Sequence, residues 1–463
     1  MEPQNGDDRR DFLKKASLGG LSLGAMNFSS IEEEVEYATQ NVSRHSSPSD
    51  LEITDLRIAE VGSTPIVRID TNQGVYGLGD VRDGADPRYA LMLKSRLLGR
   101  DPTNVEKLFK HVKQFGGHGR QGGGVSGVEV ALWDLAGKAY GVPVYQLLGG
   151  KYRDEVRIYV DTPTVESPQK FAQRMQGRVD QGFTFLKMDV GIGLIDEQQG
   201  TLTGAEVWKN EEGELQGWND QPGTYGNTEH PFTRIQITDE GLDQLAEYFA
   251  AVREQIGYEM PIGVDHLGHF GVNSAIRFGR RMEEFNLAFL EDVVPWQYTD
   301  MWEEISRSIA VPTNTGEDAY LLDGFKDLID RRAVDLVHPD PLSAGGLLET
   351  KKIGDYAEQH GVAMFLHHAA SPVSFMGTIH SAAATENFVA LEHHSVDNPW
   401  WEDLVTGIDK PIVDDGYVTV PEKPGIGVEL NEEVVKEHLN DDSGYFEPTP
   451  EWNEKRSWDR TWS

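Results

Sequence analysis

Six polar side chains recur at near-constant spacing between residues 261 and 392. The set consists of Asp265, Glu291, Glu317, Asp340, His367 and Glu392. Successive members lie 26, 26, 23, 27 and 25 residues apart. Five carboxylates and a histidine gathered at one place would repel one another strongly without a counter-charge. A bound divalent cation is the economical source of that charge. The spacing therefore predicts that these residues share one cation site.

Three of these carboxylates, those of Asp265, Glu291 and Glu317, each close a short β-prone run, namely PIGVD, LAFLE and VPTNTGE. Carboxylate oxygens at neighbouring strand ends form an oxygen-only site, which suits octahedral Mg²⁺ with water and substrate as its remaining ligands. A catalytic zinc site usually recruits histidine or cysteine, and the chain contains no cysteine. A single surface carboxylate carries no information, but three at matched positions predict a Mg²⁺ site.

A second pair, Asp340 and His367, ends consecutive runs, so the two side chains can meet. A carboxylate bonded to one imidazole nitrogen fixes the tautomer and makes the other nitrogen a better base. The alternative is a histidine that is merely hydrogen-bonded in the core. The position of His367 beside the three predicted metal ligands favours the general base.

The predicted cluster is completed by Lys187, Asp189 and Glu392. Lys187 could hold a carboxylate oxygen of a substrate, or act as a second base if its pKa is depressed. It could also be a solvated lysine paired with Asp189. Glu392 could exchange a proton with the substrate or only balance charge. A hard cation, an imidazole base and a cationic clamp together suit removal of a weakly acidic proton next to a carboxylate.

The elements that must position these groups are strand–helix units. EVRIYVDT and FTFLKMDVG precede the six runs that carry the spaced residues, which makes eight expected strands. Amphipathic segments such as NSAIRFGRRMEEF and LLETKKIGDYAEQHG separate them and predict helices. Polar residues at the carboxyl ends of parallel strands converge on one mouth when the sheet closes. We therefore expect an α/β fold with a TIM-type (β/α)8 barrel over residues 151–395.

The rest of the chain predicts further parts. Residues 51–150 read as an α+β domain that opens with an antiparallel hairpin and contains a glycine-dense stretch, FGGHGRQGGGVSG. That stretch lacks the GxxxxGK[ST] pattern, so a mobile loop near a mouth is expected rather than a phosphate site. An insertion at 193–235 is long enough to be a lid, an oligomer contact or a disordered segment. Residues 396–463 should return to pack on the first domain.

Composition narrows the class of protein. The 463 residues contain 42 basic and 77 acidic side chains, a formal net charge of −35. This balance disfavours nucleic acid and anionic membrane surfaces as partners, and favours solubility. No apolar run approaches the roughly 20 residues that a membrane span needs. The absence of cysteine excludes disulfides, thiolate metal sites and cysteine nucleophiles.

The first 50 residues predict a signal and a linker. Arg9 and Arg10 are followed by DFLKK and a short run of small apolar residues, ASLGGLSLGAM. This order is typical of a twin-arginine export signal, which favours a periplasmic or exported protein. The alternatives are a disordered charged tail and a cytoplasmic location. The polar, Ser-rich residues that follow, to about residue 50, are expected to lack structure.

Taken together, these motifs resemble the enolase superfamily, in its mandelate racemase and sugar-acid dehydratase branch. The similarity covers about residues 51–433. It rests on VSGVEVALWDLAGKAYGVPVYQLLGGKYRDEVRIY, FLEDVVPW, NTGED, HPDPLSAGGLLE, MFLHHAASPV, VALEHH and PGIGVELNEE. The first of these looks like the junction between the family's capping domain and its barrel. The resemblance implies a capping domain over residues 51–150, a small-molecule acid-sugar substrate and a homo-oligomer.

The resemblance also implies residue roles. Position by position, it makes Asp265, Glu291 and Glu317 the Mg²⁺ ligands. It makes His367 with Asp340 the general-base dyad of the family. Glu392 would be a substrate-side group, and Lys187, Asp189 and His368 are candidates to bind the substrate.

Two departures from the family pattern bear on the reaction. The racemase pattern has two lysines on the second strand, whereas this chain has Lys187 and then Asp189. One base plus an acid that expels a β-hydroxyl suits dehydration better than racemisation. The position two residues after Asp265, often Asn or His in the family, is Leu267. The general acid is then open among His266, His269 and His368.

The sequence thus predicts a Mg²⁺-dependent dehydratase that converts an aldonate-type sugar acid to a 2-keto-3-deoxy acid. One alternative keeps the site but makes the protein a cycloisomerase or an epimerase of a related sugar acid. The other is an exported sugar-acid-binding protein without turnover. The sequence does not choose the sugar, because specificity depends on the geometry of long loops.

Overall fold

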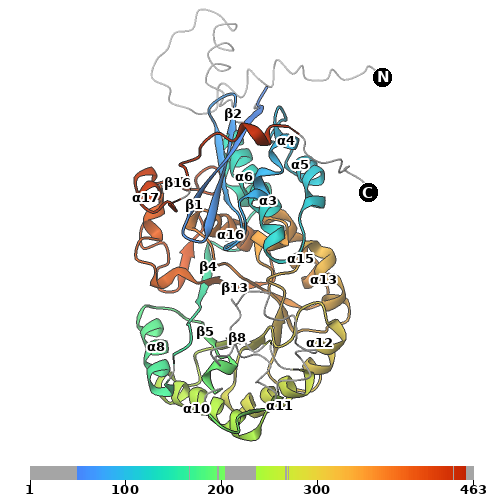
Figure 1. Cartoon of the computed structure of the whole chain (residues 1–463), viewed down its shortest axis with the longest axis vertical. Helices are drawn as coiled ribbons and strands as arrows, with labels where there is room; N and C mark the ends of the chain where they lie inside the picture. Colours follow the sequence, from blue (N-terminus) through green and yellow to red (C-terminus); the bar gives the residue numbers. More distant parts are fainter. Residues whose placement is uncertain are drawn as a thin grey trace, which may run out of the picture. The chain divides into compact units, whose positions relative to one another are not determined.

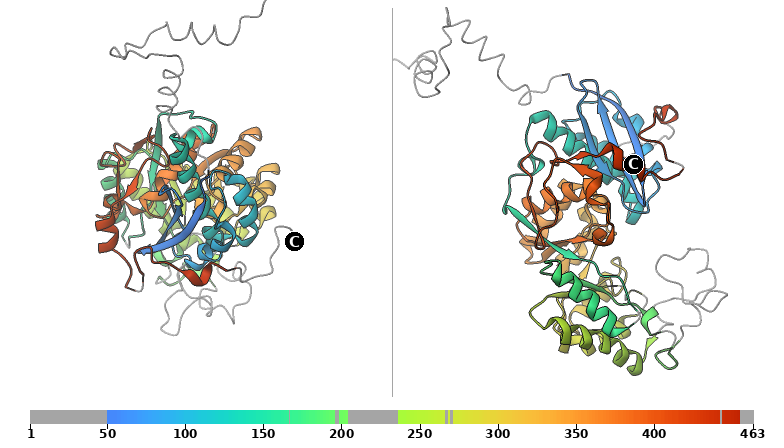
Figure 2. Two further views of the ribbon diagram at one scale, coloured as in Figure 1. Left: turned by 90° about the horizontal axis from the view of Figure 1, so that it is seen from above. Right: turned by 90° about the vertical axis from the view of Figure 1, so that its left-hand side faces the viewer.

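The structure is a computed structural model. It describes residues 50–165, 167–195, 198–203, 236–265, 268, 271–441 and 443–454. The predicted export signal, His266, His269 and most of the 193–235 insertion lie outside these residues. The described part belongs to one compact unit, residues 45–463 (Figures 1 and 2).

Eight parallel strands close into a barrel, as predicted. Their bounds are β4 (Glu155–Val160), β5 (Leu186–Asp189), β8 (Ile262–Asp265), β9 (Phe289–Glu291), β10 (Thr313–Thr315), β11 (Leu336–Val337), β12 (Ala363–Leu366) and β13 (Phe388–His393). Each strand pairs with the next, and β13 pairs back with β4, where Glu392 lies opposite Tyr159. The closed sheet brings all eight carboxyl ends to one mouth.

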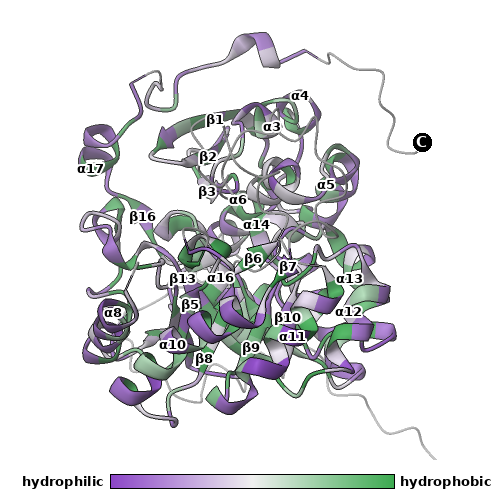
Figure 3. Cartoon of the chain, turned by 60° about the horizontal axis from the view of Figure 1, so that its bottom comes forward, coloured by the Kyte–Doolittle hydropathy of each residue, from purple (hydrophilic) through white to green (hydrophobic). Residues whose placement is uncertain are grey.

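Helices follow the strands and cover the barrel. They are α8 (Pro168–Asp180), α10 (Asp239–Ile256), α11 (Val272–Met282), α12 (Thr299–Ser306), α13 (Leu321–Asp330), α14 (Pro341–Ala344), α15 (Leu347–Gln359) and α16 (Pro372–Ala384). Hydrophilic and hydrophobic stretches alternate along most of them (Figure 3). The hydroxyl of Thr238 caps α10 by accepting a hydrogen bond from Gly241 N, and two acidic residues in its first turn suit the helix dipole.

The N-terminal part is a three-stranded antiparallel sheet with helices. Its strands are β1 (Ile53–Val61), β2 (Thr64–Thr71) and β3 (Tyr76–Asp80), and its helices are α3 (Arg88–Leu91), α4 (Lys94–Leu97), α5 (Val105–Val112) and α6 (Gly123–Tyr140). The expected antiparallel element is formed, and VYGLGD, predicted to return after the TNQG turn, supplies its third strand, β3. Apolar side chains from β1, β2 and the helices form a core of their own beside the barrel core.

The expectation of a mobile loop over residues 115–127 is wrong from Gly123 onward, where α6 begins. The glycines allow α6 to lie directly against the strands and the chain after them. A Cβ at Gly127 would lie 2.2 Å from the carbonyl oxygen of Asp80, and one at Gly123 would lie 2.7 Å from the Arg82 backbone nitrogen. Close approach of backbones, rather than flexibility, explains why this stretch is rich in glycine.

The C-terminal segment contacts both earlier parts. Its elements are β14 (Val405–Thr406), β15 (Tyr417–Thr419), β16 (Glu429–Leu430) and α17 (Glu432–Glu437). Leu404, Val435 and Phe446 pack on apolar residues of β1 and β2, and β15 pairs antiparallel with β4 of the barrel. We retain the division into 51–150, 151–395 and 396–463 as a proposal. Two short strands, β6 (Leu202–Thr203) and β7 (Gln236–Ile237), pair at the two ends of the insertion.

No helix in the described part of the chain combines the length and the hydropathy of a membrane span.

A buried carboxylate joins the N-terminal sheet to the barrel. Asp80, at the end of β3, accepts hydrogen bonds from the Ser371 hydroxyl (2.7 Å), the Ser374 backbone nitrogen (3.1 Å) and the Ser374 hydroxyl. All three donors lie at the start of α16, so the negative charge also meets the positive end of the helix dipole. Burial raises the pKa of Asp80 to about 6, so above that pH the carboxylate is ionised in this contact.

We expect Asp80→Ala to lower the free energy of unfolding by about 1–3 kcal/mol, because three buried donors lose their acceptor. Urea unfolding at pH 8 measures the change. Asp154→Ala is the matched control, since Asp154 is 85% exposed and its ion pair is with Lys151, three residues earlier in a non-helical stretch. Equal stability of the two variants would contradict the role of Asp80.

Candidate active site

The predicted residues meet at the mouth of the barrel. They come from the carboxyl end of a strand or from the one to three residues after it. Five of them, Lys187, Asp189, Asp265, Glu317 and His367, line a cavity of about 230 Å³, whereas Glu291, Asp340, Glu392 and His368 are not among its lining residues. Its lining consists of Arg82, Asp83, Arg120, Asp161, Lys187, Asp189, Asp265, Gly268, Asp292, Glu317, His367, Ala369 and His394. The cavity is therefore walled mainly by charged groups, as an anionic ligand with a cation would require.

The buried side chain of Lys187 lines this cavity. Its Nζ is 2.5 Å from Glu392 Oε1, 3.1 Å from Asp265 Oδ2 and 3.6 Å from Glu291 Oε2. Burial disfavours the charge, but the surrounding carboxylates outweigh burial and hold the pKa of Lys187 well above its usual range. Lys187 is thus a fixed cation that links carboxylates of β8, β9 and β13.

The predicted histidine–aspartate pair is formed. Nδ1 of His367 lies 2.6 Å from Oδ2 of Asp340, and the other Asp340 oxygen accepts from Leu342 N (2.6 Å) at the start of α14. Burial opposes ionisation of Asp340, but Arg82 and His367 lower its pKa to about 2. With Nδ1 engaged by a carboxylate, Nε2 is the basic nitrogen of His367. It lies 3.4 Å from Glu317 Oε2, at the edge of the cavity.

A residue that sequence reasoning missed, Arg82, reaches this pair from the chain just after β3. Its Nη2 lies 3.0 Å from Glu317 Oε1, and its Nη1 lies 3.4 Å from Asp340 Oδ2 and donates to the hydroxyl of Ser343. The guanidinium side chain is fully buried. A planar fork of donors suits two carboxylates at once, which a lysine could not serve in the same way.

We expect Arg82→Met to lower the free energy of unfolding by about 3–5 kcal/mol, because Asp340 and Glu317 lose a buried counter-charge. Arg88→Met is the matched control: Arg88 is 72% exposed and pairs with a single carboxylate, that of Asp86. Its unfolding curve should match that of the wild type. The comparison is made by urea unfolding. Coincident curves for the wild type, Arg82→Met and Arg88→Met would contradict the claim that Arg82 stabilises the fold.

Two further missed residues, His338 and Tyr159, contact the carboxylates of Glu291 and Glu392. His338 Nδ1 lies 2.7 Å from Glu291 Oε1, without hydrogen-bond alignment, and its Nε2 lies 2.7 Å from the hydroxyl of Tyr159. That hydroxyl also donates to Glu392 Oε2 at 2.8 Å. Burial disfavours the imidazolium, but the two glutamates raise the pKa of His338 to about 10. An aromatic layer that includes Phe185, Phe289 and Phe365 packs around Tyr159.

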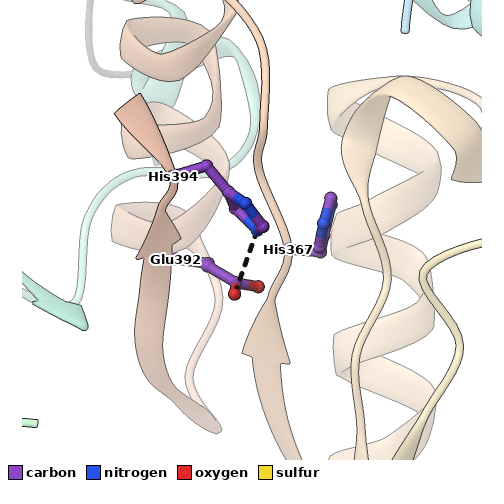
Figure 4. A group of neighbouring side chains, drawn as sticks. All are labelled: His367, Glu392 and His394. Carbon is purple, nitrogen blue, oxygen red and sulfur yellow. Dashed lines mark ion pairs between the residues drawn. The ribbon is translucent and has the colours of Figure 1, made fainter. Parts of the chain in front are cut away.

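Sequence reasoning also missed Asp161 and His394, and the ring of His394 lies beside the carboxylate of Glu392 (Figure 4). His394 Nε2 lies 3.1 Å from Glu392 Oε1, and His394 Nδ1 lies 3.5 Å from Asp161 Oδ2. Asp161 closes the expected first strand, EVRIYVDT, so the strand-end pattern contained the signal that would have identified it. His394 follows Glu392 by two residues.

The remaining predicted residues differ in whether they line the cavity. Asp189 lines the cavity. His368 is buried, its Nε2 lies 2.9 Å from the hydroxyl of Ser374, and it is not among the residues that line the cavity. Burial lowers the pKa of His368 to about 4. His266 and His269 lie outside the described residues, so their roles stay predictions.

The carboxylates fit a hard cation. Both oxygens of Glu291 are fully buried and have no aligned hydrogen-bond donor, although His338 and Lys187 are near. Burial raises the pKa of Glu291, which is the expected penalty for an ionised group short of partners. In the described part of the chain, Glu291, Glu317 and His338 bring one ligand atom each within 4.8 Å of one another. Asp265 joins Glu291 through Lys187. Asp265 and Glu317 line the cavity, and carboxylate oxygens such as theirs are the ligands that Mg²⁺ prefers.

Comparisons with known proteins agree with this geometry. Residues 170–434 match the family model described as enolase C-terminal domain-like, and residues 34–149 match that of the mandelate racemase / muconate lactonizing enzyme N-terminal domain. The chain is a member of the enolase superfamily. Its relatives place it in the branch of that superfamily that contains sugar-acid dehydratases.

Three relatives illustrate the match of this enolase-superfamily chain. D-xylonate dehydratase of Haloferax volcanii is 32% identical over 410 residues, which is 86% of this chain and 91% of the relative. Arabinonate dehydratase of Saccharolobus solfataricus is 28% identical and covers 80% and 89% of the two chains. The crystal structure of a mandelate racemase/muconate lactonizing enzyme-like protein from Rubrobacter xylanophilus is 31% identical, with a TM-score of 0.72 over 86% of this chain and 99% of the other.

Proposed function

We propose that the protein is a Mg²⁺-dependent hydro-lyase that dehydrates an aldonate to a 2-keto-3-deoxy acid. The observation that carries the proposal is the orientation of His367. One of its ring nitrogens is fixed by Asp340, and the other lies at a cavity that also contains the Lys187 cation. The dehydratase names of the relatives at 28–32% identity support the reaction class.

In this proposal Asp265, Glu291 and Glu317 hold Mg²⁺, which when bound would neutralise the substrate carboxylate and the charge that develops on it. Lys187 orients a carboxylate oxygen of the substrate. Nε2 of His367 removes the proton on the α-carbon, and Asp340 stabilises the imidazolium that results. The β-hydroxyl then leaves as water after it gains a proton, and the enol rearranges to the keto acid.

The buried surroundings support this chemistry. The side chains of Arg82, Lys187 and His338 are fully buried, and the aromatic cluster around Tyr159 is buried too, so these cations are fixed in surroundings of low dielectric constant. Charges held in place need no reorganisation when the α-proton leaves, so they stabilise the transition state more than mobile water would. The net arrangement suits formation of an anion next to a carboxylate.

Product analysis tests the proposal. The purified protein is incubated with Mg²⁺ and D-xylonate, D-arabinonate or D-galactonate, with an EDTA-treated sample as the control. We expect a keto acid that reacts with semicarbazide and a product lighter than the substrate by one water, both lost on metal removal. A product of unchanged mass would instead indicate the cycloisomerase or epimerase alternative. The absence of any product from all three acids would contradict the proposal that the protein is an aldonate dehydratase.

We also propose that the protein is exported, forms a homo-oligomer and binds a small-molecule acid sugar. Export by a twin-arginine signal rests on residues 9–26, which lie outside the described part of the chain. The prediction of a homo-oligomer rests on the family resemblance. A small-molecule acid sugar is the proposed ligand of the cavity, whose charged walls suit an anion bound together with a cation.

A further inference from the structure

The geometry points to His394 as the general acid that protonates the departing β-hydroxyl. This inference rests on the proposed dehydration and names the one role in it that the sequence left open. None of the three histidines considered from the sequence is His394, and no motif argument singled it out.

The first support is position. His394 lies just after β13, and His367 lies just after the neighbouring strand β12. Both side chains line the same cavity, and their ring centroids are 5.1 Å apart. Figure 4 shows the two rings projecting into one space from adjacent chain segments, with the Glu392 carboxylate beside His394. The β-hydroxyl is one carbon away from the α-proton, so its proton donor must lie this close to the base.

The second support is access. The His394 side chain is 28% exposed, whereas that of His338 is fully buried and that of His367 is 4% exposed. Its Nε2 is buried beside Glu392. Nδ1 lies 3.5 Å from Asp161 Oδ2, a separation longer than a normal hydrogen bond. A substrate hydroxyl can therefore take the place of that weak contact and accept a proton from Nδ1.

The third support is charge. The groups that face His394 are the carboxylates of Asp161 and Glu392, the ammonium of Lys187 and the ring of His367. Burial disfavours the imidazolium and Lys187 opposes it, but the two carboxylates outweigh both and raise the pKa of His394 to about 9. The ring therefore carries a proton at neutral pH, as an acid must.

Other described donors are placed less well. His368 is bonded to Ser374 and does not line the cavity. His338 is fully buried between Tyr159 and Glu291. Lys187 is held by Glu392 and Asp265. His394 alone among these four combines a protonated ring, access to the cavity and proximity to His367.

The proposed elimination transfers one proton to His367 and one from His394. The α-carbon–hydrogen bond breaks and its proton goes to Nε2 of His367, while the electron pair forms the carbon–carbon double bond. The bond from the β-carbon to oxygen breaks, and that oxygen takes a proton from Nδ1 of His394 and leaves as water. The resulting enol tautomerises to the 2-keto-3-deoxy acid. His367 releases its proton to solvent, and solvent returns a proton to His394.

A leaving group that needs no proton tests the assignment. Wild type and His394→Asn are compared on D-xylonate, D-arabinonate and D-galactonate and on their 3-deoxy-3-fluoro counterparts, from which fluoride leaves as an anion. We expect His394→Asn to lose at least about 100-fold in dehydration, the typical contribution of an acid. It should eliminate fluoride within about threefold of the wild-type rate, because only the hydroxyl depends on a general acid.

The outcomes separate the possibilities. An equal loss on hydroxyl and fluoride substrates would show that His394 binds or supports structure, and would overturn the assignment. Unchanged dehydration would overturn it too. No elimination by the wild type from either set would contradict the proposed function itself. Asp161→Asn provides a second variant, expected to show the same selective loss for the hydroxyl substrates to a smaller degree, because Asp161 only favours the charged ring.

Discussion

Replacing His367 with asparagine lowers the rate of dehydration by about 10³-fold, because the α-proton loses its base while the cation site stays intact. Asparagine retains a polar group next to Asp340 but has no nitrogen that accepts a proton at neutral pH. The rate of keto-acid formation at saturating aldonate measures the loss. Substrate binding should change much less, since His367 acts in the chemical step and Lys187 and the metal hold the carboxylate.

The matched control for this variant is His360→Asn. His360 follows α15 on the surface, where its Nδ1 lies 2.9 Å from the Tyr356 carbonyl and its Nε2 lies 3.5 Å from Asp330. His360 is not among the residues that line the cavity. Wild-type activity in His360→Asn together with wild-type activity in His367→Asn would refute the base assignment.

Replacing Glu291 with glutamine weakens Mg²⁺ binding by about 100-fold or more, since a neutral amide oxygen replaces a charged ligand. The substitution is nearly isosteric. Both carboxylate oxygens of Glu291 are buried without a hydrogen-bond donor, so this residue is the one chosen to test cation binding. Mn²⁺ can stand in for Mg²⁺ at oxygen sites, so titration followed by electron paramagnetic resonance measures the affinity directly. Activity should fall in parallel.

Glu284→Gln is the control for the metal prediction. Glu284 is 62% exposed and pairs with Arg281 on the protein surface. Its Mn²⁺ affinity should equal that of the wild type. If Glu291→Gln and Glu284→Gln bound Mn²⁺ equally well, the carboxylates at the barrel mouth would not be the cation site.

The spacing of polar residues at strand ends predicted where the barrel mouth lies, and the predictions named five of the residues that line its cavity, Lys187, Asp189, Asp265, Glu317 and His367. Asp265, Glu291 and His367 lie where a closed parallel sheet places the carboxyl ends of its strands. The prediction succeeded because it required only the order of the elements and their shared direction. The same reasoning applied to EVRIYVDT would have added Asp161.

Other residues depend on details that the sequence does not contain. His367 and His368 are adjacent, yet one faces the cavity and the other bonds to Ser374 at the start of α16. Neighbouring residues of an extended chain point to opposite sides, so a one-residue shift in the expected strand exchanges their roles. Only the register of the folded barrel settles which side chain points where.

Arg82 illustrates a second reason why sequence spacing alone does not identify every residue of the site. It lies in the N-terminal part of the chain, more than 230 positions from Glu317, and no spacing rule connects the two. Its place at the barrel mouth follows from the contact of β3 with α6 and α16, which the glycines of α6 and the carboxylate of Asp80 make possible. A residue delivered by domain docking cannot be found from the periodicity of one domain.

Release of the substrate's α-hydrogen is the most direct test of the account. Aldonates labelled with deuterium at carbon 2 are incubated with wild-type protein and Mg²⁺, and deuterium in the water and keto acid are measured together. We predict that wild type removes the label from carbon 2 of every molecule it converts, and that His367→Asn leaves the label in place. A label that stays at carbon 2 of all aldonates with wild type, or that His367→Asn removes equally fast, would contradict the account.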